Sequence, residues 1–161
     1  MEITTARVEN IEAIRSVVEA SWDVDYPETI SRETVTEGID EWYSEESLTA
    51  AITAPKTPVL VARDERVVGF AHAVVDGETG VVLRLYVDPS HRREGIGGEL
   101  FERARDELEA YDVEKIRALV LADNDTGNEF YRRVGMTVVS TDETRIGGEW
   151  FDENTYELAE P

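Results

Sequence analysis

The fold is decided by the stretch Leu83-Arg-Leu-Tyr-Val-Asp-Pro-Ser-His-Arg-Arg-Glu-Gly-Ile-Gly-Gly-Glu-Leu100. Apolar and β-branched residues over 81–87 predict a strand, and Pro89 ends it. A helix is predicted over about 95–110, because hydrophobic side chains recur there at every fourth residue: Ile96, Leu100, Ala104 and Leu108. A strand therefore turns through a basic, glycine-rich loop into an amphipathic helix.

The start of this helix is typical of an anion-binding site. Its first N–H groups have no acceptor within the helix, and they lie at the positive end of the helix dipole. Gly95, Gly97 and Gly98 have no Cβ, so a diphosphate can approach the backbone closely. Arg92 and Arg93 add two positive charges, which would repel the dipole unless an anion is present. The alternative is that these two arginines are solvated surface residues.

The other elements follow from the same periodicities. Strands are also predicted at 1–8, 59–63, 67–75, 115–121, 136–145 and 150–158. Helices are also predicted at 10–22, 31–42, 45–53 and 124–134. The strand at 81–87, the helix after it and the strand at 115–121 form a right-handed parallel crossover. The expected order is β-α-α-β-β-β-α-β-α-β-β, an α+β sandwich with helices on both faces of one mixed sheet.

Length and composition favour one domain that spans residues 1–161. Hydrophobic residues make up 41% of the chain, which is enough for a substantial core. No hydrophobic run approaches the roughly 18 residues of a membrane span, and the N-terminus lacks the hydrophobic region of a signal peptide. We therefore expect a cytoplasmic protein without membrane contact. The absence of cysteine excludes a thiol nucleophile and a disulfide, and two histidines disfavour a zinc site, so no metal is expected.

The chain is strongly acidic, with 36 Asp and Glu against 16 Lys and Arg, and its formal net charge is −20. One interpretation is a halophile's adaptation to high salt, because above about 1 M the Debye length falls below roughly 3 Å and self-repulsion is screened. The alternative is an ordinary acidic cytosolic protein. In either case the chain offers no extended basic face, so nucleic acid is not an expected partner.

Two motifs resemble the GCN5-related N-acetyltransferase (GNAT) superfamily, and the resemblance covers nearly the whole chain. Val87-Asp-Pro-Ser-His-Arg92-Arg-Glu-Gly95-Ile-Gly97 is similar to the family's Arg/Gln-x-x-Gly-x-Gly/Ala pyrophosphate loop. Asn124-Asp-Thr-Gly-Asn-Glu-Phe130-Tyr131-Arg-Arg-Val-Gly135-Met136 is similar to the family's Asn-x-x-Ala-x-x-Phe-Tyr-x-x-x-Gly-Phe, with Gly127 and Met136 as departures. A Rossmann fingerprint would need a third glycine where Leu100 stands, and the Gly-Lys-Ser/Thr of a Walker A loop is absent.

The resemblance implies that acetyl-CoA lies between two parallel strands that splay apart, near 81–87 and 115–121. Main-chain groups of Leu85, Tyr86 and Val87 would pair with the pantetheine arm as an added strand would. The diphosphate would bind N–H groups of residues 93–98, with charge from Arg92 and Arg93. The expected cofactor-binding residues of the loop are Arg92, Arg93, Gly95, Ile96, Gly97 and Gly98. Asn124 would hydrogen-bond the pantetheine arm, cap the helix that follows it, or do both.

The resemblance also implies catalytic roles. Tyr131 would protonate or stabilise the CoA thiolate as it leaves, pointing into the cleft while Phe130 points to the core; the alternative is a core tyrosine. A main-chain N–H near Val87 would hold the oxyanion. Many relatives carry a glutamate base where Leu83 stands, so the base is open among His72, Glu28, Glu33 and Tyr26. His72 is otherwise a satisfied core histidine.

The predicted activity is N-acetyl transfer from acetyl-CoA to a primary amine by direct attack in a ternary complex, since no cysteine can carry a covalent acetyl group. Trp22 and Tyr26 would line the acceptor pocket, although core packing explains Trp22 as well. The acceptor is a small-molecule or protein amine, and a homodimer is expected because dimers are common in the family. The alternative is an acyl-CoA-binding regulatory module without turnover, which Leu83 favours and Tyr131 opposes.

Overall fold

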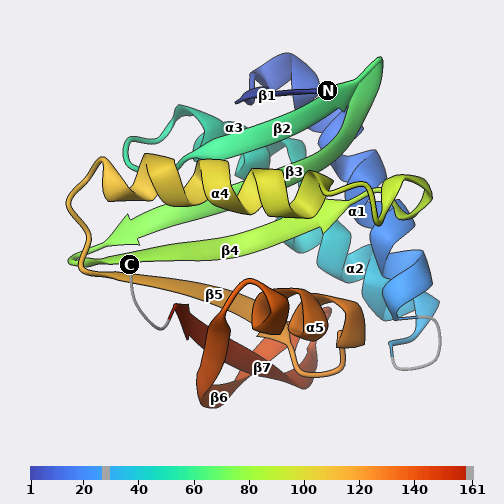
Figure 1. Ribbon diagram of the computed structural model, residues 1–161. Coiled ribbons are helices and arrows are strands. Elements are labelled where there is room, and N and C mark those ends of the chain that lie inside the picture. The colour runs from blue at the N-terminus through green and yellow to red at the C-terminus, as the bar shows by residue number, and fades with distance from the viewer. Residues whose placement is uncertain (27–29, 159–161) are drawn as a thin grey trace.

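One mixed sheet of seven strands forms the centre of residues 1–26 and 30–158, the part of the chain that the computed structural model describes (Figure 1). The strands lie in the order β1-β2-β3-β4-β5-β7-β6. Neighbouring strands are antiparallel, except that β4 and β5 are parallel. This arrangement confirms the predicted α+β architecture around one mixed sheet.

The observed elements match the predicted ones closely. The strands are β1 (Glu2–Thr5), β2 (Val59–Asp64), β3 (Arg66–Asp76), β4 (Thr79–Val87), β5 (Lys115–Leu121), β6 (Met136–Ile146) and β7 (Glu149–Leu158). The helices are α1 (Ile11–Asp25), α2 (Arg32–Trp42), α3 (Glu45–Thr53), α4 (Ile96–Glu109) and α5 (Asp125–Arg133). The short 3-10 turns are η1 (Val8–Asn10) and η2 (Pro89–His91). The two stretches predicted after α1 are separate helices, α2 and α3.

Two boundaries differ from the prediction by three residues. The first helix continues three residues past Trp22, because the sequence has no glycine or proline before Pro27 to stop it. The Tyr26 N–H still donates to the Trp22 carbonyl, at 3.0 Å. The first strand is shorter than expected, since η1 occupies residues 8–10.

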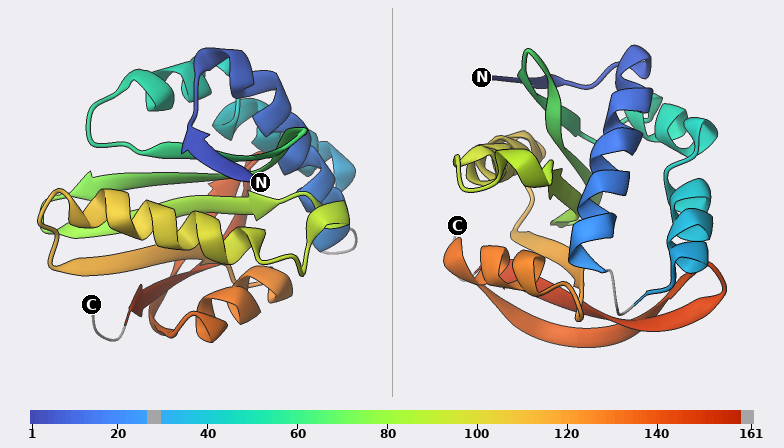
Figure 2. Two further views of the ribbon diagram at one scale, coloured as in Figure 1. Left: turned by 45° about the horizontal axis from the view of Figure 1, so that its top comes forward. Right: turned by 90° about the vertical axis from the view of Figure 1, so that its right-hand side faces the viewer.

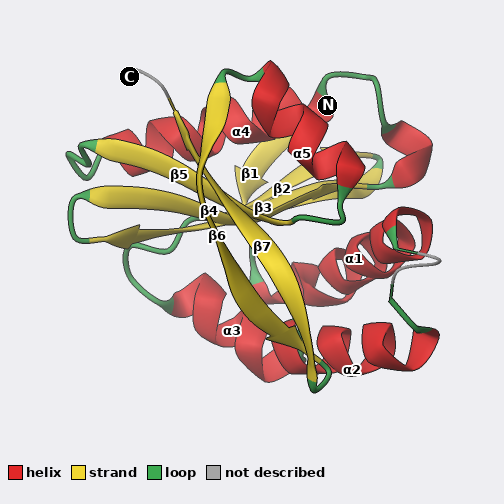
Figure 3. Cartoon of the chain, turned by 90° about the horizontal axis from the view of Figure 1, so that it is seen from below, coloured by secondary structure: helices red, strands yellow, loops and turns green. Residues whose placement is uncertain are grey.

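The helices form two layers, one on each face of the sheet. Figure 3 shows α1, α2 and α3 on one side and α4 and α5 on the other, and the right-hand view of Figure 2 shows α1 and α4 on opposite sides of the strands. Ile14 and Trp22 of α1 pack with Phe70 of β3 in one hydrophobic core. Leu100 and Leu108 of α4 lie in the second core. The predicted stripe of α4 is buried along its length, which confirms its amphipathic character.

The parallel pair β4 and β5 separates partway along its length. Register partners extend from Thr79 and Lys115 only to Val82 and Ala118, although both strands continue beyond those residues. On the other side of β4, Ala73 pairs with Val82 and His72 pairs with Arg84, so Leu83 is an extra residue in a β-bulge. The bulge bends β4 where it leaves β5. The predicted splay of these strands is therefore confirmed.

The terminal hairpin of β6 and β7 carries three exposed large hydrophobic side chains: Val138, Val139 and Trp150. Across residues 1–26 and 30–158, none of the helices combines the length and the hydrophobicity that crossing a bilayer requires.

Candidate active site

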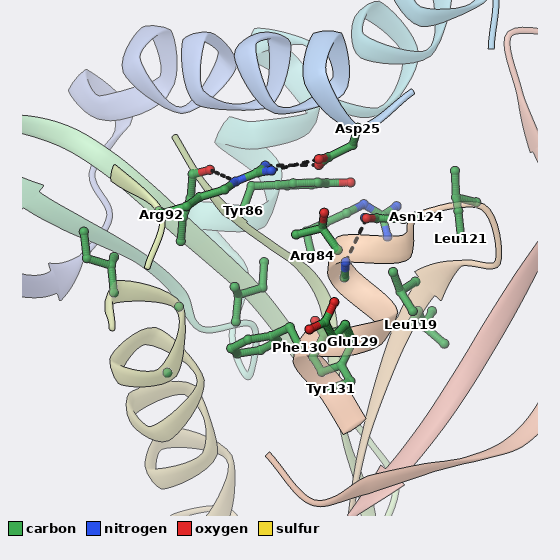
Figure 4. A pocket seen from close by; sticks show the side chains of 18 of the residues that line it. Asp25, Arg84, Tyr86, Arg92, Leu119, Leu121, Asn124, Glu129, Phe130 and Tyr131 are labelled. Atoms are coloured by element: carbon green, nitrogen blue, oxygen red, sulfur yellow. Dashed lines mark hydrogen bonds and ion pairs between the residues drawn. The ribbon is translucent and has the colours of Figure 1, made fainter. Parts of the chain in front are cut away.

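A cleft of about 580 Å³ opens where β4 and β5 separate (Figure 4). Its walls are the ends of these two strands, the loop before α4, the first turn of α4 and one side of α5. All the predicted cofactor-binding residues line it: Leu85, Tyr86, Val87, Arg92, Arg93, Gly95, Ile96, Gly97, Gly98, Asn124 and Tyr131. The structure thus brings the two sequence motifs onto one cavity.

The Arg92 side chain joins the loop to the first helix. Its guanidinium donates to both carboxylate oxygens of Asp25, at 2.8 and 3.1 Å, and its Nε donates to the Val87 carbonyl at 3.3 Å (Figure 4). Asp25 is nearly fully buried, with 4% of its side chain exposed. The anion that balances Arg92 is therefore a residue of the protein. Sequence analysis missed Asp25, because nothing local relates the end of α1 to a loop 67 residues later.

The N-terminus of α4 faces the cleft. Gly95 precedes the helix with a φ of 83°, a left-handed conformation that favours glycine. A Cβ on Gly97 would lie 3.3 Å from Phe130 Cε1 and 3.7 Å from Val87 Cγ2, which leaves no room for a larger side chain. Arg93 is exposed beside the cleft. Free N–H groups, missing side chains and a cation together fit a bound diphosphate.

The loop between β5 and α5 is fixed by two asparagines. Asn124 Oδ1 accepts from the Gly127 N–H at 2.8 Å, so Asn124 is the N-cap of α5. Asn128, which is buried, donates from Nδ2 to the carbonyls of Leu121 and Asn124, at 2.9 and 2.7 Å. Its Oδ1 accepts from the Tyr156 hydroxyl at 2.7 Å. Asn128 was not predicted, and its signal was a polar residue on the inner face of an amphipathic helix.

Tyr131 and Phe130 both line the cleft. Phe130 packs against the core, as expected, but it also borders the cleft, because consecutive residues of a short helix that forms a cavity wall can both border the cavity. Tyr131 is 3% exposed, and its ring packs against the rings of Phe130 and Tyr156 at centroid distances of 5.2 and 5.7 Å. Within the part of the chain that the structure describes, its hydroxyl has no hydrogen-bond partner. Burial raises the pKa of Tyr131.

The end of the cleft beside α1 and α2 contains aromatic and charged side chains. Trp22 lines it although the residue is 1% exposed, and Trp42 of α2 lies beside Trp22, with ring centroids 6.2 Å apart. Tyr26 does not line the cleft. It is 1% exposed and packs edge-on against Trp22 in the core, at 5.6 Å. Arg84 lies in the same region, with its guanidinium carbon 4.4 Å from the centre of the Trp42 ring.

Of the four predicted candidates for the base, the three that the structure describes do not line the cleft. His72 is paired with Arg84 across β3 and β4 but does not line the cavity. Burial, helped by the charge of Arg84, lowers the pKa of His72 to about 4, which makes it a weak base. Glu33 is exposed in the first turn of α2, outside the lining. Burial raises the pKa of Tyr26 well above its usual value, and Glu28 lies outside the described residues.

Glu153 of β7 is a cleft carboxylate that sequence analysis missed. Among the described residues the carboxylates that line the cleft are Asp25, Glu129 and Glu153. Asp25 is ion-paired and Glu129 is exposed, whereas Glu153 is half-buried and lies opposite Leu121 across β5 and β7. Burial raises the pKa of Glu153, and the charge of Arg84 partly opposes that shift. A carboxylate with a raised pKa is suited to accept a proton near neutral pH.

Within residues 1–26 and 30–158, no group of three His, Cys, Asp or Glu side chains is arranged to hold a metal ion.

Comparison with known proteins shows that this chain is similar to acetyltransferases. The sequence model of a family described as "Acetyltransferase (GNAT) family" matches residues 13–136. The spermidine N(1)-acetyltransferase of Thermoplasma acidophilum is 26% identical over 162 residues, and the match covers 98% of each chain.

Solved structures show the same relationship. The crystal structure of the PaiA N-acetyltransferase from Thermoplasma acidophilum in complex with coenzyme A superposes with a TM-score of 0.83 at 27% identity, covering 94% of this chain and 96% of that one. A GCN5-related N-acetyltransferase from Rhodopseudomonas palustris shares the fold, with a TM-score of 0.82 at 19% identity over 98% of this chain and 94% of its own.

Proposed function

The chain belongs to the acetyltransferase (GNAT) family, and we propose that it transfers an acetyl group from acetyl-CoA to a primary amine by direct attack in a ternary complex. The observation that carries this proposal is the separation of β4 and β5, which brings the glycine-rich loop, Tyr131 and Glu153 onto one cleft. When bound there, acetyl-CoA supplies an acetyl group on a thioester. The chain has no cysteine to accept that group first, which supports direct transfer to the amine.

The lining of the cleft fits acetyl-CoA along its length. The N–H groups of Ile96, Gly97 and Gly98 would bind the diphosphate, and Arg93 would add charge beside it. Arg92 would act indirectly, by tying the loop to Asp25. Past residue 82, β4 has no partner on its β5 side, so main-chain groups there can pair with the pantetheine amides as a neighbouring strand would.

Replacing Gly97 with valine is expected to lower acetyl-CoA affinity at least tenfold, about 1.4 kcal/mol. The added Cβ would lie 3.3 Å from Phe130, and the two methyl groups beyond it would occupy the diphosphate site. Titration calorimetry with acetyl-CoA measures the effect. Glu102→Val is the control, because it places the same side chain on the exposed side of the same helix and should bind normally. Equal affinities for wild type and Gly97→Val would remove the diphosphate site from the proposal.

Two side chains would assist the transfer, Glu153 as a base and Tyr131 as a hydrogen-bond donor. An alkylammonium with a pKa near 10.4 is neutral in about one molecule in 10³ to 10⁴ at pH 7, so a base must take its proton. Glu153 would accept one proton from the ammonium, and the amine nitrogen would form the bond to the acetyl carbon. As the carbon–sulfur bond breaks, the leaving thiolate would take up the second proton that the nitrogen loses, which gives the amide and free CoA thiol. The Tyr131 hydroxyl would donate a hydrogen bond to the leaving thiolate. A main-chain N–H of the freed part of β4 would hold the oxyanion.

Turnover separates this function from an acyl-CoA-binding regulatory module. Release of free CoA thiol is measured across a panel of amines at saturating acetyl-CoA. Thiol release that depends on one class of amine, with the acetylated amine found by mass spectrometry, supports the enzyme. Tight acetyl-CoA binding with no thiol release from any amine would support the regulatory module, which the presence of Leu83 at the bulge still favours.

The acceptor is a small-molecule amine or an amine of a protein, and the name of the Thermoplasma relative makes spermidine one member of the panel. We also propose a homodimer, for which the exposed hydrophobic side chains on β6 and β7 offer a surface.

We also propose that the acidic composition is an adaptation to high salt. If the net charge of −20 strains the fold in dilute buffer, the melting temperature should rise steadily from about 0.1 M to about 3 M KCl, because salt screens the self-repulsion. Scanning calorimetry at several KCl and NaCl concentrations measures it. A melting temperature that is flat or falls over this range would leave only the ordinary acidic protein.

A further inference from the structure

Arg84 is a cleft side chain to which acetyl transfer gives no role. It is half-buried, lines the cavity and stacks on Trp42, with its guanidinium carbon 4.4 Å from the ring centre. Within residues 1–26 and 30–158 it makes one hydrogen bond, from its Nη1 to the Leu83 carbonyl at 2.8 Å, and its guanidinium carbon also lies 6.0 Å from the centre of the Tyr43 ring. Among the described residues, no carboxylate oxygen lies within 4.0 Å of it. Most of the five N–H donors of this guanidinium therefore remain available to a ligand.

The surroundings of Arg84 differ from those of Arg92, another arginine that lines the cleft. Arg92 has a buried counter-ion in Asp25, with which it makes two hydrogen bonds. Arg84 makes no ion pair with a described residue, although a partly buried cation without an ion-pair partner loses hydration without compensation. A guanidinium held over an aromatic ring, with most of its donors unused by described residues, matches the bidentate recognition of a carboxylate.

Arg84 is also too far from the glycine-rich loop to serve the diphosphate. It precedes Val87 by three residues, about 10 Å along a strand. It lies opposite His72, on the sheet face that carries the stacked rings of Phe70 and Tyr86. Trp22 of α1 belongs to the core on this face. Glu153 lies on the same face, beside Leu121. The acceptor end of the cleft therefore contains Arg84, which makes no ion pair with a described residue, and the carboxylate of Glu153, on which the charge of Arg84 acts.

We propose that the acceptor is an amino acid whose carboxylate binds Arg84 and whose amine faces Glu153. This inference rests on the proposed transfer to a primary amine, and it names the class of that amine. A polyamine such as spermidine, for which the Thermoplasma relative is named, would bring a second ammonium group toward Arg84. The like charges of that ammonium and the guanidinium would repel each other. An amino acid presents one group of each sign to side chains of the opposite sign.

The test compares each amino acid with its own carboxamide. Glycine, L-methionine, L-phenylalanine, L-glutamate and L-lysine are assayed beside their α-carboxamides and beside spermidine, and kcat/KM is measured by thiol release. For the preferred amino acid, wild type should favour the acid over the amide at least tenfold. The amide's amine is the less basic and therefore more often neutral, so its chemistry works against the expected preference.

Arg84→Gln should bring the ratio of acid to amide close to one, through a raised KM for the acid. Arg117→Gln is the matched control. It removes an arginine from the neighbouring strand, where Arg117 is ion-paired with Glu157 outside the cleft, and it should keep the wild-type ratio. A wild-type preference for amides or for spermidine would overturn the inference, and so would an unchanged ratio in Arg84→Gln.

A binding experiment separates this inference from the proposed activity. Calorimetry measures the affinity of the CoA-loaded protein for N-acetyl-L-methionine and N-acetyl-L-phenylalanine against their carboxamides. If no amine is acetylated but the acids bind at least tenfold tighter than the amides and lose that advantage in Arg84→Gln, turnover fails and the carboxylate site stands. Equal binding of acids and amides by wild type would overturn the site whatever the turnover.

Discussion

Replacing Tyr131 with phenylalanine is expected to lower kcat by about 10²- to 10⁴-fold and to leave acetyl-CoA affinity near the wild-type value. The substitution removes one hydroxyl from a ring whose packing against Phe130 and Tyr156 is kept. Burial raises the pKa of Tyr131, so the phenol stays protonated at neutral pH. A phenol is a weaker acid than a thiol, which favours hydrogen bonding to the leaving thiolate over complete proton transfer. Thiol release with the best acceptor gives kcat, and calorimetry gives the Kd of acetyl-CoA.

Tyr156→Phe shows what a structural hydroxyl does in the same region. Tyr156 is fully buried, and its hydroxyl donates to Asn128 at 2.7 Å. Its loss should cost roughly 1 kcal/mol of stability, visible in the melting temperature, with kcat of the folded protein changed only slightly. If a well-folded Tyr131→Phe protein behaves in the same way, the donor role is lost. Water or a group of the substrate would then stabilise the leaving thiolate.

Local pattern predicted most of the fold, because each element carries its own periodicity. The stripe through Ile96, Leu100 and Leu108 defines α4, and that stripe is buried as expected. Chain direction then requires a parallel crossover between β4 and β5. The local pattern does not show how strands distant in the sequence pair or in which register. The bulge at Leu83 depends on the register of β3 against β4, and no local signal marks it.

The two halves of the site differed in how far the sequence predicted them. The loop at 92–98 and the segment from Asn124 to Tyr131 were predictable, because each is a continuous motif beside its own helix. The other end of the cleft was not, since it is assembled from β4, β7, α1 and α2. Glu153 reaches the cleft only because β7 lies between β5 and β6 in the sheet. His72 was a reasonable candidate from its strand pattern, but its side chain does not line the cavity.

Glu153→Gln is expected to lower kcat/KM by about 10²- to 10⁴-fold near neutral pH, because the amide cannot accept the ammonium proton. The shape of the side chain is kept, so acetyl-CoA affinity should change little. Wild type should show a rise of kcat/KM with pH as Glu153 ionises, above the usual range of a glutamate, since burial raises its pKa. That limb of the profile should be absent in the variant. Initial rates between about pH 5 and 9 measure both effects.

Stability gives Glu153→Gln a second readout with a definite sign. Because the folded pKa of Glu153 is raised, the stabilisation from its neutral form is complete below the unfolded pKa and is lost as pH rises through the folded pKa. Glutamine has no charge to bury, so it does not lose stability as pH rises. The variant should therefore melt at or above the wild-type temperature at pH 7, and the melting temperatures of the two proteins should converge at low pH. Glu157→Gln is the control for the rate. Glu157 is on the same strand and is ion-paired with Arg117 outside the cleft, so this variant should keep the wild-type dependence of kcat/KM on pH. A Glu153→Gln enzyme that retains both its rate and its acid limb would exclude Glu153 as the base and leave deprotonation to water.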